Sequence, residues 1–195
     1  MEPGSVVIVD FTGLKVYRKD EWYQEKHNVS SRHTWRKLHI AIGENYQVLA
    51  CELTTLEVGD TTAVPYLLAQ IETNFETFIG DGAYDGDQVS QAVLEKEPKA
   101  KVVIPPPKTA VLSTTEDTQR DQHIQTIKQQ GRMAWQRETG YNLSSLVELS
   151  IQRYKRIFGN IMKARKLSQQ KTEAWISLFA LNIMTSLGMS VSVKI

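Results

Sequence analysis

The stretch NFETFIGDGAYDG, residues 74–86, leads from β-favouring residues into an abrupt turn that carries two aspartates. The apolar segment from Phe75 to Gly80 predicts a buried strand. Asp81 follows it directly and precedes the flexible Gly82. An Asp-Gly turn or a helix cap is the ordinary explanation for such an aspartate, although Asp87 is better placed to cap the next helix. A charge at the end of a buried strand also fits a binding or catalytic role.

The sequence around this stretch predicts an α/β fold. Three β-rich runs on the amino-terminal side indicate an antiparallel meander, and helices and strands alternate after it. The expected elements are strands at Val6–Tyr17, Trp35–Ile42 and Tyr46–Leu56, a helix from Asp60 to Ile71, the strand at 75–80, a helix at Asp87–Lys96 and a strand at Lys101–Ile104. The pattern favours a mixed sheet with helices packed on it.

The carboxyl-terminal half is expected to be helical. Residues 109–122 are rich in Ser, Thr, Asp and Gln, which is typical of a loop or linker between the sheet-bearing part, residues 1–108, and the helical part, residues 123–195. Helices are predicted at His123–Thr139, Leu143–Phe158 and Thr172–Leu187. The whole chain then forms a single domain.

Composition excludes several classes of protein. Cys51 is the only cysteine, so no internal disulfide forms, and a reducing cytosol is the expected compartment. Ala174–Met189, the longest apolar stretch, contains polar residues and falls short of the ~18 apolar residues that cross a membrane. Net charge is only +1, but residues 151–166 hold six basic residues and no acidic one. This segment predicts a local positive surface.

Asp10 repeats the arrangement of Asp81, because it ends the run Val6–Val9. A buried carboxylate without a partner is too costly to persist. A hydrogen bond to the following turn would be the bland explanation.

Glu148 lies on the predicted helix at 143–158. At 100° per residue, the helix places four residues on one narrow stripe at the edge of its apolar face: Tyr141, Ser144, Glu148 and Lys155. Glu148 is therefore expected to point along the sheet surface.

Three acids that converge require a cation, because two carboxylates ~4 Å apart repel by ~4 kcal/mol at an effective dielectric of ~20. Oxygen ligands without a cysteine or histidine cluster favour Mg²⁺ or Mn²⁺ over zinc. The histidines have no recognised zinc spacing: His27, His33, His39 and His123.

A set of motifs now resembles a known family. The matching segments are Asp10-Phe-Thr-Gly-Leu-Lys-Val-Tyr, Thr34-Trp-Arg-Lys-Leu-His, Leu53-Thr-Thr with Gly59-Asp60, Asp81-Gly-Ala-Tyr-Asp, Tyr141 with Ser145-Leu-Val-Glu148, and Arg153-Tyr-Lys-Arg-Ile-Phe-Gly. In order and spacing they resemble the DDE transposases of bacterial insertion sequences, in particular the group named after insertion sequences four and five.

The resemblance implies a ribonuclease-H-like catalytic domain that cuts double-stranded DNA at transposon ends and joins the 3′ hydroxyl to target DNA. Asp10, Asp81 and Glu148 match the three catalytic acids, which would hold two Mg²⁺ or Mn²⁺ ions. The implied partners are transposon-end and target DNA and further copies of the chain, as a homodimer or higher. The implied location is the bacterial cytoplasm, on the nucleoid when DNA is bound, with no membrane association.

The implied DNA contacts are mostly basic. Tyr141, Glu148 and Lys155 are similar to three members of the family's Tyr-Arg-Glu-Lys signature. The residues expected at DNA are Tyr141, Ser144, Lys155, Arg153, Arg156, Arg36 and Lys37.

The sequence departs from the family in three respects. Ser144 stands where the signature arginine would fall, Phe11 replaces a small polar residue, and an amino-terminal DNA-recognition domain is expected to be absent. The alternatives are an inactive transposase remnant that only binds DNA, a nuclease acting on RNA–DNA hybrids, and a plain interaction domain.

Overall fold

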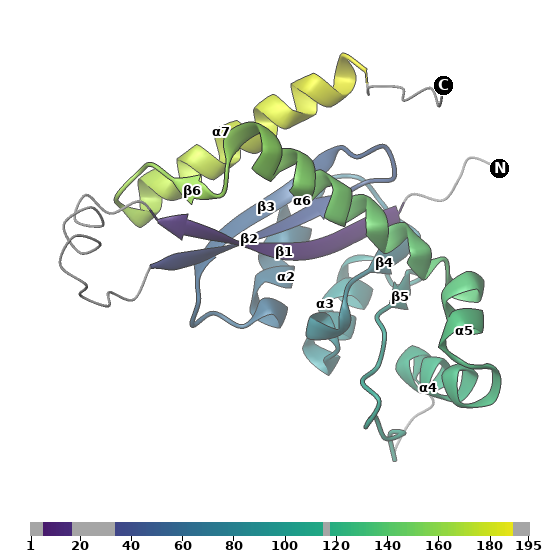
Figure 1. The fold of residues 1–195 in the computed structure, drawn as a ribbon. Coiled ribbons are helices and arrows are strands. Elements are labelled where there is room, and N and C mark those ends of the chain that lie inside the picture. The colour runs from purple at the N-terminus through teal and green to yellow at the C-terminus, as the bar shows by residue number, and fades with distance from the viewer. Residues whose placement is uncertain (1–5, 17–33, 115–117, 189–195) are drawn as a thin grey trace.

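The computed structural model describes residues 6–16, 34–114 and 118–188, so Tyr17, His27, His33 and Met189 of the predictions lie outside it. Within these ranges the chain forms a mixed sheet with helices on both faces, which confirms the α/β prediction (Figure 1). The strands are β1 (Val6–Val16), β2 (Trp35–Ile42), β3 (Val48–Thr55), β4 (Thr77–Ile79), β5 (Lys101–Val103) and β6 (Ile161–Met162). The helices are α2 (Asp60–Gln70), α3 (Asp87–Lys96), α4 (Gln119–Gln130), α5 (Arg132–Thr139), α6 (Ser145–Phe158) and α7 (Leu167–Ser186), with short 3₁₀ turns η1 (Gly82–Tyr84) and η2 (Tyr141–Ser144).

The sheet has six strands in the order β3-β2-β1-β4-β5, with β6 pairing to the end of β1. β1, β2 and β3 are antiparallel neighbours, as the predicted meander requires. β4 runs parallel to β1, and β5 runs parallel to β4. β1 is therefore central, and its β-branched residues are buried on both sides.

Two hydrophobic cores lie on opposite faces of the sheet. Ile8 and Leu14 of β1 point to the face that α6 and α7 cover, where Val147, Ile151 and Leu178 pack on them. The alternate β1 residues point to the other face, beneath α2 and α3 (Figure 1). A side chain of β1 therefore faces α6 or α2 according to its position in the two-residue period of the strand.

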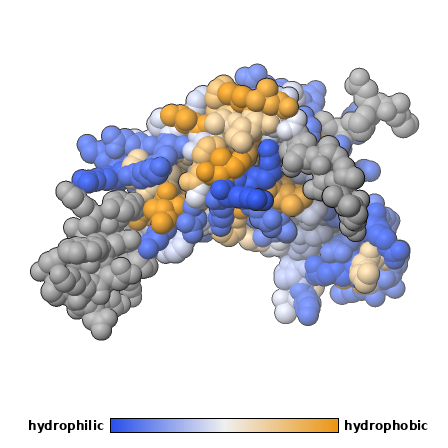
Figure 2. Space-filling view, turned by 45° about the horizontal axis from the view of Figure 1, so that its top comes forward, coloured by the Kyte–Doolittle hydropathy of each residue, from blue (hydrophilic) through white to orange (hydrophobic). Residues whose placement is uncertain are grey.

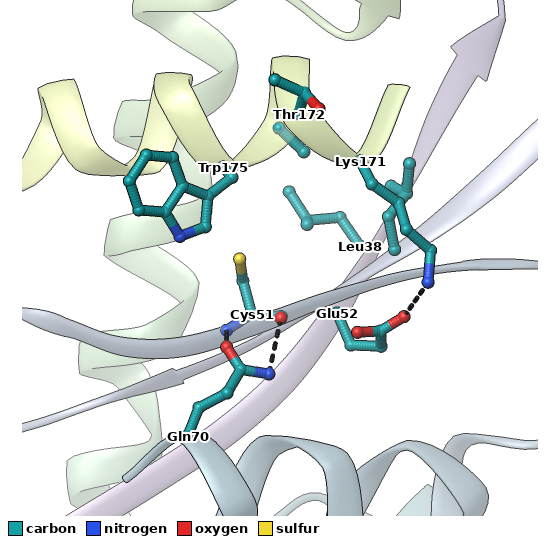
Figure 3. Close-up of a pocket in the computed structure, with 9 residues that line it drawn as sticks. Leu38, Cys51, Glu52, Gln70, Lys171, Thr172 and Trp175 are labelled. Carbon is teal, nitrogen blue, oxygen red and sulfur yellow. Dashed lines mark hydrogen bonds and ion pairs between the residues drawn. The ribbon is translucent and has the colours of Figure 1, made fainter. Parts of the chain in front are cut away.

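The outer edge of β3 is closed by side-chain amides. Gln70 of α2 accepts a hydrogen bond from Cys51 N–H (3.2 Å) and donates one to Cys51 C=O (3.0 Å), as Figure 3 shows. Asn182 of α7 does the same for Val48, at 2.7 and 2.8 Å. A pocket of about 360 Å³ lies between this edge and α7, beside the Lys171–Glu52 ion pair.

The edge of β5 is closed by α4. Gln119 accepts from Val102 N–H (2.9 Å) and donates to Ala100 C=O (3.0 Å). The ring Nε2 of His123 is bonded to Val102 C=O at 2.8 Å. These three hydrogen bonds hold the start of α4 against the sheet.

Helix α7 is apolar on both of its faces. Ala174, Leu178 and Leu181 are buried against the sheet, while Trp175 and Phe179 on the outer side are each more than half exposed, with their rings stacked. Apolar surface is visible on this side of the molecule in Figure 2. No helix within the described residues combines the length and hydropathy that a membrane crossing needs.

Several boundaries differ from the predictions. The helix expected at 123–139 begins at Gln119 and is broken at Gly131, whose φ of 85° ends α4. The helix expected from Leu143 begins at Ser145, because 141–144 forms η2. α7 begins at Leu167 rather than at Thr172, and β6 interrupts a region expected to be helical throughout.

Candidate active site

Asp10 lies in the middle of β1, on the face that α6 covers. It is two residues beyond Ile8 and pairs across to Ile40 of β2, and both of these neighbours belong to the α6-side core. Its Oδ1 accepts a hydrogen bond from the N–H of Phe11 at 2.7 Å. Burial raises the pKa of Asp10 to about 6; the Phe11 bond opposes the rise, and the charges of Asp81, Glu148 and Asp60 add to it. The carboxylate of Asp10 is therefore partly buried and surrounded by negative charge.

Asp81 lies at the same level of the neighbouring strand. Ile8 of β1 pairs with Ile79 of β4, and Asp10 and Asp81 each follow two residues later on parallel chains. Neighbouring strands are ~4.8 Å apart, so the register brings the two carboxylates to the same edge of the α6-side core. Asp81 also caps η1, accepting from Ala83 N–H at 3.0 Å. Burial raises its pKa, the Ala83 bond opposes the rise, and the charge of Asp60 adds to it.

Glu148 approaches from above the sheet. It is an exposed residue in the first turn of α6, next to Val147, which is buried against β1 and β2. Its negative charge contributes to the raised pKa of Asp10. Asp81 and Glu148, from two other segments, are thus both near enough to influence the ionisation of Asp10.

The described residues contain no group of three or more His, Cys, Asp or Glu side chains already close enough to hold a metal ion. The donor set itself, three carboxylates without sulfur or imidazole, fits Mg²⁺ or Mn²⁺.

A fourth acid, Asp60, borders the site. It is the first residue of α2, whose cap is Gly59, and it forms an ion pair with Lys37 Nζ at 2.9 Å. Its charge raises the pKa of both Asp10 and Asp81. From the sequence, Asp60 is expected only as a motif residue and as the start of a helix. Its place beside Asp10 and Asp81 depends on the order of the strands in the sheet, which local sequence patterns do not give.

A buried polar pair lies under the acids on the α2 side. His39 is fully buried, with Nε2 3.0 Å from Thr54 Oγ1 and Nδ1 3.5 Å from the hydroxyl of the buried Tyr84. Burial lowers the pKa of His39 and raises that of Tyr84, so both are uncharged near neutral pH. His39 and Tyr84 therefore add no charge beneath the acids.

The expected DNA-contacting residues fall into three places. Tyr141 is in η2, and its ring packs at a tilt against Trp135 with the ring centroids 5.1 Å apart; burial first, and then the charge of Asp81, raises its pKa. Ser144 hydrogen-bonds the Tyr141 side chain and precedes α6. Both residues border the acids, but they lie outside the α-helix, so the single helical stripe with Glu148 and Lys155 does not apply to them.

The expected basic residues are partly engaged already. Arg36 bonds Gln170 of α7 through Nε at 2.8 Å, and Arg153 bonds Thr185 of α7 at 3.1 Å. Lys37 is held on the opposite face by Asp60 and by Val58 C=O at 3.0 Å. Lys155 and Arg156, in the last turn of α6, are half-buried and exposed respectively. The last turn of α6 thus offers the most accessible positive charge of this set.

A family model described as a transposase DDE domain matches residues 2–183, nearly the whole of the 195-residue chain. The match includes all three acids and the sheet and helices that position them. The ribonuclease-H-like α/β architecture expected from the sequence is the fold that accompanies this family. The chain belongs to the family of transposase DDE domains.

Proposed function

We propose that this domain cleaves DNA at transposon ends and transfers the freed 3′ hydroxyl to target DNA, as a member of the insertion sequence four and five group. The observation that carries the proposal is the strand register, in which Asp10 and Asp81 each follow the paired residues Ile8 and Ile79 by two positions, and the charges of Asp81 and of Glu148 from α6 both raise the pKa of Asp10. Neighbouring carboxylates with raised pKa values are typical of functional sites. The binding of cations beside a phosphodiester would account for them here.

Each acid has an assigned role in the proposal. Asp10 is the shared ligand, because it interacts with both other acids, and Asp81 and Glu148 complete one ion site each. When bound, two Mg²⁺ or Mn²⁺ ions would lower the pKa of the attacking water or hydroxyl and stabilise the leaving oxygen. Asp10 must be deprotonated to bind a cation, so loading near pH 6 is expected to release protons from Asp10.

Basic residues would hold the duplex by its phosphates without reading its sequence. Lys155 and Arg156 are the first candidates, and Tyr141 and Ser144 lie next to the acids. Arg36 and Arg153 would contact DNA only by sharing or exchanging their bonds to α7. The proposed assembly on DNA is a homodimer or higher.

Nicking of supercoiled plasmid by the purified chain, with Mg²⁺, with Mn²⁺ and with EDTA, tests the proposal. Metal-dependent nicking that disappears in Asp81→Asn supports it. DNA binding without nicking in either metal would overturn it in favour of an inactive DNA-binding remnant. Equal nicking by the wild type and Asp81→Asn would overturn the assignment of the site.

A further inference from the structure

The turn that carries Asp81 is anchored in the core by the buried Tyr84, and the residue that follows Tyr84, Asp85, is held by a second contact. Asp81 bonds Ala83 N–H, and Tyr84 N–H returns to Asp81 C=O at 3.1 Å, so η1 is a single short turn closed on itself. It is flanked by Gly80, where the backbone packs so closely on Tyr84 and Val9 that an added Cβ would lie 3.2–3.3 Å from both. The Asp81–Ala83 bond fixes the Asp81 side chain relative to the turn, so the direction of the carboxylate depends on how the short turn itself is held.

Asp85 ends this turn and is held by a bidentate ion pair. Arg120 donates from Nε to Oδ1 at 2.8 Å and from Nη2 to Oδ2 at 2.9 Å. The side chain of Asp85 is 8% exposed and that of Arg120 is 29% exposed. Exposed single ion pairs contribute little, but a bidentate pair on a buried carboxylate fixes both distance and orientation.

Arg120 is itself a fixed point relative to the sheet. The preceding residue, Gln119, bridges the backbone of β5 at Val102 and Ala100, and His123 adds a third bond one turn later. Thr118 and Asp121 form a capping box that closes the start of α4. The guanidinium also donates to Val111 C=O at 3.3 Å.

We propose that the Arg120–Asp85 ion pair positions the Asp81 turn, so that the carboxylate of Asp81 stays aligned with Asp10. Neither residue touches substrate in this scheme; both act through Asp81. The inference rests on the proposed function for its catalytic meaning, while its structural content stands alone. Helix α4 thus supports Asp81 indirectly, through the ion pair of Arg120 with Asp85 at the other end of the turn.

The first test needs neither DNA nor metal. In Arg120→Gln, hydrogen exchange of the Ala83 amide, which bonds Asp81, is expected to accelerate by on the order of tenfold, as in local opening. The matched control is Arg132→Gln, which removes an α5 arginine that bonds Pro106 C=O at 2.9 Å and should leave Ala83 unchanged. An unchanged Ala83 rate in Arg120→Gln overturns the inference. So does equal acceleration at Val102, because the pair would then only hold α4 to the sheet.

The second test uses nicking with Mn²⁺ as the probe. Arg120→Gln should raise the Mn²⁺ concentration for half-maximal nicking by on the order of tenfold, because residues that orient a metal ligand affect metal affinity. The kcat at saturating Mn²⁺ and the Kd for DNA should be nearly unchanged. Arg120→Lys keeps the charge but loses the bidentate geometry and should be intermediate. The double variant Asp85→Arg, Arg120→Asp should recover part of the Mn²⁺ response. A loss of kcat that no Mn²⁺ concentration restores, in a folded variant, contradicts positioning.

The two arms separate this inference from the proposed function. If the wild type never nicks DNA, the proposed function fails, and the Ala83 exchange rate still decides the inference. If the wild type nicks and the exchange rate does not respond, the function stands and the inference fails.

Discussion

Replacing Asp10 by Asn should stabilise the metal-free protein at neutral and alkaline pH while abolishing metal-dependent cleavage. The folded-state pKa of Asp10 is raised to about 6, from an ordinary value of 3.8. The folded protein therefore binds more protons than the unfolded chain between these values, and the free energy of unfolding falls as pH rises through that window. The penalty is absent below about pH 4 and fully present above about pH 6, the reverse of an ordinary ion-paired aspartate.

The magnitude follows from the shift. Two pKa units correspond to ~3 kcal/mol at ~1.36 kcal/mol per unit. Asp10 is partly exposed, and solvent screening reduces this to ~1–2 kcal/mol. In a chain of this length the gain corresponds to an increase in Tm of ~2–8 °C. Asn retains an oxygen that can accept the Phe11 N–H bond, so the substitution removes mainly the charge.

Urea unfolding in EDTA at pH 4, 6 and 8 measures the effect. The gain of Asp10→Asn should be near zero at pH 4 and largest at pH 8. Asp121→Asn is the control: hydrogen bonds from Ser113 and Thr118 lower the pKa of Asp121 from its ordinary 3.8, so its loss should destabilise the protein to nearly the same extent at pH 4, 6 and 8 and matter less only at lower pH. A gain for Asp10→Asn that is equal at pH 4 and pH 8, or no gain at pH 8, refutes the electrostatic reasoning.

Three further outcomes are expected. Asp81→Asn and Glu148→Gln should each abolish metal-dependent nicking. DNA affinity, measured by fluorescence anisotropy, and the circular dichroism spectrum should stay close to wild type. Retained nicking in either variant would remove that residue from the site. Ser144→Arg should strengthen DNA binding and steepen the log-log salt dependence by up to ~0.9 for one added phosphate contact, and an unchanged slope would mean that position 144 does not face DNA. Gly131→Ala should lower the free energy of unfolding by ~1–2 kcal/mol, because φ at Gly131 is 85°, and urea unfolding at pH 7 with no measurable loss would contradict the strain.

Elements defined by local pattern could be predicted closely from the sequence. The strand Trp35–Ile42 and the helix Asp87–Lys96 have the bounds that their periodicity indicates. Elements that depend on distant partners could not be predicted in this way. β6 is two residues long and exists because Ile161 pairs with Lys15, and η2 begins at Tyr141, whose ring packs against Trp135.

The candidate site shows the same division. Asp10 and Asp81 stand out because each carboxylate interrupts a buried strand pattern, which a single sequence displays. The ion pairs of Asp60 with Lys37 and of Asp85 with Arg120 join residues 23 and 35 positions apart. Only the sheet register and the docking of α4 bring these groups together, and no local period encodes either.

The Asn182 amide, which closes the β3 edge at Val48, is made late during synthesis on the ribosome. Asn182 lies 134 positions after Val48, whereas Gln119 follows Ala100 by only 19. At ~5–20 residues per second, the β5 edge waits roughly 1–4 s for its cover, and Val48 waits roughly 7–27 s. During that interval the nascent meander presents an unpaired strand edge to neighbouring chains. Gln70 covers this edge at Cys51 early, but translation that stalls or ends before residue 182 would leave its Val48 end open, which marks that end of β3 as the place where truncated products should begin to aggregate.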